Sequence, residues 1–240
     1  MASLQFSVKG LDGRRMQRHT TIHTAQIMKI TRFVCNMVRE NTYLIHDDRG
    51  DAALIDCGAF YSEEQGAILQ NILENDLTLK RLLNTHGHFD HVFGAKFIQG
   101  TYGIGIEIDE NEKDTYKSAA TQMMQFIGQP LPLELAPVAN YFHDGDILTV
   151  GDLNLHVIAT PGHTPGGVCF YLPEEKVLFS GDSLFREEIG RCDLPGGNET
   201  QLVNALKSKV LVLPDDVTVY PGHGEATTIG HERAHNPYLK

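Results

Sequence analysis

The sequence predicts one mixed α/β domain, in which two groups of short strands are separated and flanked by helices. Short runs rich in β-branched and aromatic residues, bounded by polar and glycine-bearing turns, recur along the chain and are typical of strands. Helical periodicity appears between them. No stretch rich in Pro or Ser marks a linker, and 240 residues suffice for one sizeable core.

The first group of elements follows Met28. Strands are expected at KITRFV (29–34), NTYLIH (41–46), AALID (52–56) and within LKRLLNTH (79–86). The stretch 62–76 predicts a helix, because Ser62 can cap it and acidic residues follow in its first turn. The apolar stripe of this helix would consist of Ile68, Leu69, Ile72 and Leu73. A short helix over 92–99 and a strand over 103–108 complete the group.

Residues 109–142 differ in composition from the rest of the chain: a charged helical stretch is followed by three prolines. We interpret them as an inserted helix and loop that flanks a site, since long insertions are usually functional. A helix is expected at 199–211. The second group of strands is expected at DILTV (146–150), LNLHVIAT (153–160), GVCFYL (167–172), KVLFS (176–180) and DVTVY (216–220).

Composition and charge exclude several classes of protein. The net charge of −11 argues against nucleic acid or an anionic membrane as a partner, and no apolar run is long enough to span a bilayer. Residues 1–27 lack the apolar segment of a secretory signal, so we expect an N-terminal extension that is disordered or outside the core, and a domain over 28–240. The four scattered cysteines indicate reduced thiols and a cytoplasmic location.

The strongest chemical signal is the stretch NTHGHFDH (84–91), which places three histidines and one aspartate within six positions. In a turn after a strand, His86 and His88 can chelate one ion while Asp90 and His91 face a second. Imidazole and carboxylate together suit Zn²⁺, Fe²⁺ or Mn²⁺, and the absence of cysteine removes the soft-ligand signature.

Three further ligand-type residues follow apolar strands later in the chain. His163 lies in VIATPGHTPGG, Asp182 in KVLFSGDSLF and His223 in VTVYPGHGE. Strand ends are where α/β sheets usually gather their sites. The sequence therefore predicts that these three residues complete the site that NTHGHFDH begins. Asp56, at the end of another strand, is a candidate to orient a ligand histidine.

These motifs, in the order TH-x-H-x-DH, PGHTPG, SGDSLF and PGHG, resemble the metallo-β-lactamase superfamily. With GRCDLPGG added, they are most similar to its glyoxalase II (hydroxyacylglutathione hydrolase) branch, in a small single-domain form without a C-terminal helical domain. The resemblance implies an αββα sandwich with a site at one edge. It implies one metal on His86, His88 and His163, another on Asp90, His91 and His223, and Asp182 as a bridge.

The same resemblance implies two divalent metal ions, with Zn²⁺ first and Fe or Mn as alternatives. A hydroxide bridging them would attack a small thioester such as S-lactoylglutathione, with Asp90 orienting the hydroxide. Arg191 and Asp193 would brace the site.

Two alternatives follow from the same motifs. A persulfide dioxygenase of the superfamily would bind one iron through His86, His163 and Asp182, a two-histidine, one-carboxylate set. A β-lactamase is less favoured, because no secretion signal is present and Asp182 stands where many of those enzymes have a cysteine ligand.

Overall fold

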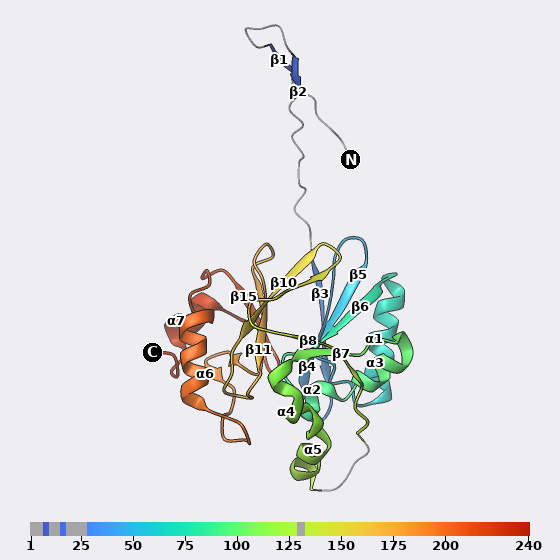
Figure 1. The fold of residues 1–240 in the computed structure, drawn as a ribbon, viewed down its shortest axis with the longest axis vertical. Helices are drawn as coiled ribbons and strands as arrows, with labels where there is room; N and C mark the ends of the chain where they lie inside the picture. Colours follow the sequence, from blue (N-terminus) through green and yellow to red (C-terminus); the bar gives the residue numbers. More distant parts are fainter. Residues whose placement is uncertain (1–6, 10–14, 18–27, 129–132) are drawn as a thin grey trace.

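Two six-stranded sheets form the centre of the molecule in this computed structural model, which describes residues 7–9, 15–17, 28–128 and 133–240 (Figure 1). The first sheet has the order β3-β4-β5-β6-β7-β8 and the second β16-β15-β12-β11-β10-β9. The strands of the first sheet are Lys29–Cys35, Glu40–His46, Asp51–Ile55, Thr78–Leu83, Ile106–Asp109 and Val138–Phe142. Those of the second, from β9 to β12 and then β15 and β16, are Ile147–Val150, Leu153–Ala159, Val168–Leu172, Val177–Gly181, Thr218–Pro221 and Thr227–Thr228.

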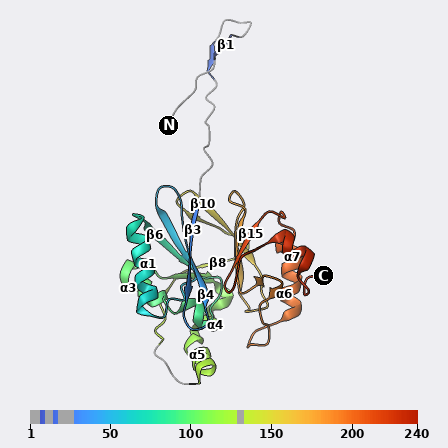
Figure 2. The same ribbon diagram turned by 180° about the vertical axis from the view of Figure 1, so that it is seen from behind.

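The helices lie on the outer faces of the two sheets, as Figure 2 shows from behind. The first sheet carries α1 (Ser62–Glu74) and α3 (Ala95–Tyr102), and the second carries α6 (Glu199–Ala205) and α7 (Ile229–His235). The remaining elements are α2 (Phe89–Val92), the 3₁₀ turn η1 (Glu110–Glu112), α4 (Lys113–Lys117), α5 (Ala119–Ile127), the strands β13 (Leu184–Phe185) and β14 (Glu188–Ile189), and the π-helical turn η2 (Leu206–Val210). These four layers confirm the predicted αββα sandwich.

Alternation along the central strands explains why these layers form. In β4, Leu44 packs among residues of α1 and α3, while its neighbour Ile45 packs against the second sheet. In β11, Cys169 faces α6 and Phe170 faces the first sheet. Successive side chains of a strand point to opposite faces, so a strand covered on both sides needs a continuous apolar run. The three resulting apolar clusters fill the spaces between the four layers.

Several boundaries differ from the sequence predictions. The residue that precedes α1 is Tyr61, and Glu64 holds this end by accepting hydrogen bonds from the backbone N–H groups of Phe60 and Tyr61, so Ser62 is not the cap. Leu73 is 76% exposed because the stripe facing the sheet is centred on Ile68 and Ile72. The helix expected over 92–99 is divided at Phe93 and Gly94, and that expected over 199–211 ends in a π-helical turn.

The stretch 109–142 is more than an inserted helix and loop. Its residues 138–142 form β8, which pairs in parallel with β7 at the edge of the first sheet. Its helices α4 and α5 lie near α2, close to the NTHGHFDH stretch. The interior segment 129–132 lies outside the described residues.

The predicted N-terminal extension is described only in part, whereas the cysteines can all be assigned. Ser7–Lys9 and Arg15–Gln17 pair as antiparallel strands β1 and β2, and the rest of the extension expected over 1–27 lies outside the described residues. Cys35, Cys57, Cys169 and Cys192 are all free thiols, as expected. Among the described helices, none is long and apolar enough to cross a membrane.

Candidate metal centre

The candidate ligands follow the ends of four strands, one from the first sheet and three from the second. His86 follows β6, His163 follows β10, Asp182 directly follows β12, and His223 follows β15. The turns after β6, β12 and β15 carry their ligands within three residues of the strand, so side chains from both sheets reach one place. The structure thus brings together all seven residues that the sequence singles out as ligands.

We call His86, His88 and His163 the first ligand group, because one nitrogen atom of each lies within 4.8 Å of the others. The Nδ1 atom of His88 is 2.9 Å from the Nε2 atom of His163. His163 Nδ1 is 2.7 Å from the backbone carbonyl oxygen of Arg191, which can only accept a hydrogen bond. That contact places the proton on Nδ1 and leaves Nε2 with the lone pair that a cation needs.

We call Asp90, His91 and His223 the second ligand group, which satisfies the same distance limit. His223 Nε2 lies 3.2 Å from Asp90 Oδ2. His91 Nδ1 is 2.9 Å from Asp56 Oδ2, so this nitrogen donates to the carboxylate and Nε2 faces the centre of the site. The second group therefore contains a carboxylate of its own, whereas the first is built from imidazoles alone.

Asp182 lies between the two groups. Its Oδ1 atom is 3.4 Å from His91 Nε2, and its Oδ2 atom is 3.7 Å from both His163 Nε2 and His223 Nε2. One carboxylate therefore faces both groups. Gly222 makes this possible, because a Cβ atom there would lie 2.3 Å from Asp182 Oδ1.

Polar atoms left without partners show what this site is suited to hold. His86 Nε2, His91 Nε2 and Asp182 Oδ1 are buried and form no hydrogen bond. Leaving buried polar atoms unpaired costs free energy, so native proteins seldom do it without a ligand. The available donors are imidazole nitrogen and carboxylate oxygen, the set that suits Zn²⁺, Fe²⁺ or Mn²⁺. The residues present therefore fit divalent metal ions.

The electrostatics of the two groups differ. Burial, and then repulsion from neighbouring imidazoles, holds the pKa of His86 well below its usual value and lowers that of His88 to about 3. Burial also disfavours the charged form of His91, but Asp182, Asp90 and Asp56 together raise its pKa well above the usual value. His86 and His88 are thus neutral, while the second group lies in a field of carboxylates that attracts positive charge.

Asp56 holds the turn that carries the ligands. Its Oδ1 atom accepts from the backbone N–H of Thr85 at 2.8 Å, and its Oδ2 atom accepts from the Thr85 hydroxyl, also at 2.8 Å, and from His91. Asp56 lies within ligand distance of His86 and His91, but both of its oxygens already accept hydrogen bonds. Its geometry is therefore that of a residue supporting ligands.

The side chains of Arg191 and Asp193 point to solvent and contact each other, which does not match the expected bracing role. The two side chains are 58% and 68% exposed and pair with each other through two hydrogen bonds of 2.8 Å. The contact of Arg191 with the candidate ligands comes from its backbone carbonyl, which orients His163. Glu112, by contrast, is absent from the sequence predictions and is fully buried against two ligand-bearing turns.

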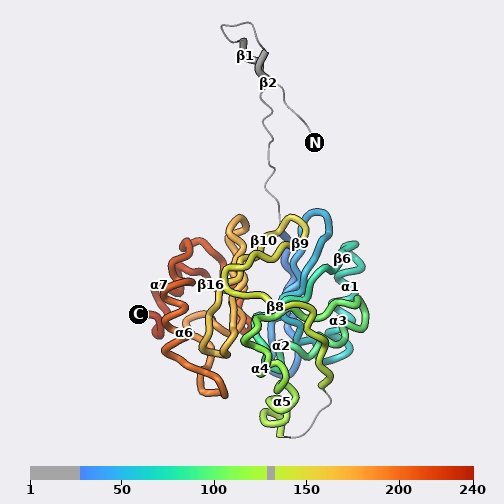
Figure 3. The backbone as a smooth tube through the Cα atoms, viewed as in Figure 1, coloured from blue at the N-terminus to red at the C-terminus, as the bar shows by residue number. Residues whose placement is uncertain are grey.

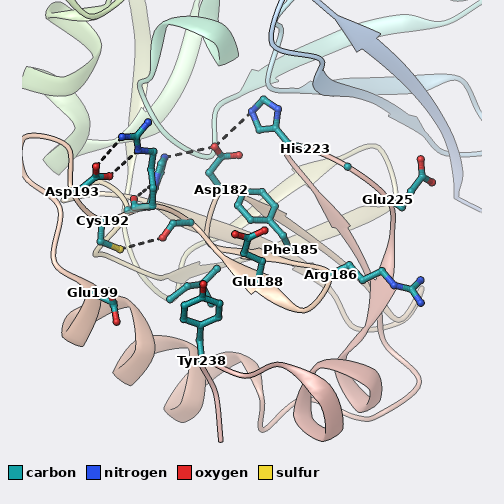
Figure 4. A pocket seen from close by; sticks show the side chains of 15 residues that line it. Asp182, Phe185, Arg186, Glu188, Cys192, Asp193, Glu199, His223, Glu225 and Tyr238 are labelled. Atoms are coloured by element: carbon teal, nitrogen blue, oxygen red, sulfur yellow. Dashed lines mark hydrogen bonds and ion pairs between the residues drawn. The ribbon is translucent and has the colours of Figure 1, made fainter. Parts of the chain in front are cut away.

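A cavity of about 950 Å³ opens beside this site (Figure 4). His163, Asp182 and His223 border it on one side. Its other walls come from the β13–β14 hairpin and the C-terminal segment, and they combine aromatic with charged side chains. The lining residues include Phe185, Arg186, Glu188, Arg191 and Tyr238. Its size suits a small molecule.

Comparison with known proteins identifies the family. The family model of the metallo-beta-lactamase superfamily matches residues 36–223, and the chain therefore belongs to this superfamily. It is 39% identical over 215 residues to the hydroxyacylglutathione hydrolase GloC of Haemophilus influenzae, covering 89% of this chain and 97% of that protein. This similarity confirms the predicted likeness to the small, single-domain glyoxalase II branch.

Two solved structures are similar over nearly their whole length. The crystal structure of the BLEG-1 B3 metallo-beta-lactamase superposes with a TM-score of 0.80 at 33% identity, covering 88% of this chain and 99% of that one. The crystal structure of TTHA1623 in a di-iron-bound form gives 0.77 at 34% identity, covering 87% and 100%. The chain thus has the fold of metal-dependent hydrolases and carries His/Asp clusters suited to metals.

Proposed function

We propose that this protein is a binuclear metal-dependent thioesterase that hydrolyses small thioesters of the S-lactoylglutathione type. The observation that carries the proposal is the convergence of two ligand groups on one carboxylate, Asp182, with three buried atoms unpaired around it. The identity to a hydroxyacylglutathione hydrolase supports the choice of thioester among the substrates of the superfamily.

In this proposal, each ligand group holds one cation and Asp182 is shared between them. Zn²⁺ is the first candidate, because imidazole and carboxylate ligands suit it, and Fe or Mn fits the same donors. The second ligand group brings its own negative charge through Asp90, and Asp56 lies behind His91. The open cavity on one side of Asp182 leaves room for a substrate.

When bound, the two cations lower the pKa of water and polarise a carbonyl group. The chain's own residues then hold the reacting groups. Burial raises the pKa of Asp90, but His91 and His223 outweigh it and keep the pKa low, so this carboxylate is ionised and can accept a hydrogen bond from an attacking water. A thiolate leaves without a strong general acid, so the proposed reaction needs no dedicated proton donor at the leaving group.

A cytoplasmic location belongs to the same proposal. The four free thiols accord with a reducing compartment. Thioesters carried by a small intracellular thiol would be available there.

A second candidate function uses part of the same site. His163 Nε2 lies 3.7 Å from Asp182 Oδ2, and with His86 these residues form a two-histidine, one-carboxylate set beside the open cavity. Such a set suits one Fe²⁺ and an oxygenase such as a persulfide dioxygenase. That reaction gives no role to Asp90, His91 and His223, which also converge here, and for this reason we favour the thioesterase.

One experiment separates these functions. The purified protein is analysed for metals and then tested on S-D-lactoylglutathione, on a β-lactam, and on glutathione persulfide with an oxygen electrode. The thioesterase proposal expects two ions per chain and hydrolysis of the thioester. One iron per chain with oxygen consumption on the persulfide would replace it with the dioxygenase, and turnover of the β-lactam alone would exclude both.

A further inference from the structure

A segment of the 109–142 stretch packs directly on both turns of the first ligand group. A Cβ atom at Gly87, between His86 and His88, would lie 2.7 Å from the backbone nitrogen of Tyr116 in α4. A Cβ atom at Gly166, three residues after His163, would lie 2.8 Å from the backbone nitrogen of Glu112. Both glycines therefore make room for this segment, which lies beside α2 in Figure 3.

Glu112 joins these two turns through its carboxylate. Its Oε2 atom accepts from the backbone N–H of Gly87 at 2.8 Å, and its Oε1 atom accepts from that of Gly166 at 2.6 Å. The side chain is fully buried, so water cannot replace either contact. Hydrogen bonds to an ionised carboxylate are short and strong, and a buried backbone N–H left unpaired is costly.

The two turns belong to different sheets. Gly87 lies in the turn after β6 of the first sheet, and Gly166 lies in the turn between β10 and β11 of the second. The 2.9 Å separation between His88 Nδ1 and His163 Nε2 therefore depends on how these turns are held relative to one another. Glu112 is a single side chain that bonds to both turns.

The segment that carries Glu112 is itself well anchored. Asp109 Oδ1 accepts a hydrogen bond from the backbone N–H of Asn111 at 2.8 Å, which holds the start of η1. The Tyr116 hydroxyl donates to the carbonyl of Ala136 at 2.7 Å inside the core. The backbone on either side of Glu112 is therefore held in place, in addition to the hydrogen bonds that its carboxylate accepts.

We propose that Glu112 is a positioning residue for the first ligand group, holding His86 and His88 against His163 and thereby setting the affinity of that group for its cation. This inference rests on the proposed two-metal function, since it assumes that each group binds one ion. The 109–142 stretch would then support the metal ligands through Glu112. In the second ligand group, Asp56 contacts the ring of His91.

The test measures Zn²⁺ affinity by competition with a chelator in wild type, Glu112→Gln and Glu232→Gln. Glutamine is isosteric, but only its carbonyl oxygen can accept, so one of the two backbone N–H groups would face an NH₂ donor instead. Glu232 is the matched control, because its equally buried carboxylate accepts from Glu187, Thr227 and Asn236, none within three residues of a candidate ligand. We expect Glu112→Gln to weaken one of the two Zn²⁺ ions by about 10- to 100-fold, and Glu232→Gln to weaken neither.

A His223→Ala background shows which ion is affected. That variant keeps only the first group intact, so adding Glu112→Gln should weaken its single remaining Zn²⁺ by a similar factor. Gly87→Ala tests the same contact from the other side and should reproduce the selective loss. Thermal unfolding establishes that each variant is folded.

Two results would overturn the role of Glu112: unchanged binding of both ions in Glu112→Gln, or an equal weakening of both ions. A wild-type protein that holds fewer than two Zn²⁺ ions contradicts the proposed function itself, whatever Glu112→Gln does.

Discussion

The two ligand groups are supported in different ways, although they share Asp182. In the second group, a carboxylate contacts a ligand ring directly: Asp56 Oδ2 lies 2.9 Å from His91 Nδ1. In the first group, the backbone makes the corresponding contact, between the carbonyl of Arg191 and His163 Nδ1. The carboxylate of Glu112 accepts hydrogen bonds from the backbone of the turns and touches no ring of a candidate ligand in the described contacts.

Because of this difference, we expect the metal affinity of the second group to depend mainly on charge and that of the first group mainly on geometry. The second group has Asp90 as a member and Asp56 behind it, so it attracts a cation even when its geometry is disturbed. The first group consists of imidazoles alone, and it binds a cation well only when three rings are held in the correct positions. Perturbing each support should therefore affect one group and leave the other nearly intact.

The largest effect is expected where the groups meet. Asp182→Ala removes the carboxylate that faces both of them, so both cations lose a ligand. We expect loss of at least one ion and more than a 100-fold fall in thioester turnover, because even an outer partner of a ligand is worth about 10- to 100-fold. Metal analysis and initial rates measure it. Activity that survives with both ions in place would show that Asp182 does not bridge them.

Removal of the metals should also have a large effect, on stability. Without cations, the imidazoles and carboxylates remain buried with unpaired atoms. Each ion at a free concentration about 1,000 times its Kd stabilises the folded state by about 4 kcal/mol. We expect the midpoint of thermal unfolding to fall on treatment with a chelator and to recover on addition of Zn²⁺ but not Mg²⁺. An unchanged midpoint would argue that no metal binds the folded chain.

An intermediate loss of metal affinity is expected for Asp56→Ala. It should affect the second ligand group, whereas Glu112→Gln should affect the first. Asp56→Ala frees His91 Nδ1 and the backbone N–H of Thr85. The ion of the second group should weaken by about 10- to 100-fold while that of the first changes little. Chelator competition measures both affinities. Equal loss at both groups would mean that Asp56 supports the site as a whole through the turn at Thr85.

The smallest effect is expected at the exposed ion pair. Arg191→Ala removes a side chain that pairs with Asp193, while the carbonyl that orients His163 remains. Metal content should stay at the wild-type value, and any change should appear in KM, because Arg191 lines the cavity. Steady-state kinetics with metal analysis tests this. A loss of metal would show that the guanidinium braces the site after all.

The sequence predicts the ligand groups better than their supports, for a physical reason. Ligands such as His163 and His223 follow apolar strands in short turns, so local pattern alone places them at a sheet edge. Glu112 acts through residues 25 and 54 positions away, and nothing near it in the sequence indicates which turns it contacts. Gly166 likewise makes room for Glu112, and the residues around Gly166 in the sequence do not indicate this contact.

Fold prediction is limited in the same way. A strand buried on both faces, such as β5, is apparent from its continuous apolar run. Strand β8 is missed because it is a half-exposed edge strand, and its pairing with β7 depends on a segment of nearly thirty residues closing between them. Leu73 is assigned to the buried stripe because periodicity does not reveal how wide a contact the sheet offers.

The most direct test of the two-group account is a titration of the metal-free protein with Zn²⁺, followed by the rate of S-D-lactoylglutathione hydrolysis at each addition. The account predicts that the rate rises until two ions are bound per chain and then levels off. A rate that is already maximal at one ion per chain would contradict it, since the second ligand group would then have no part in the reaction.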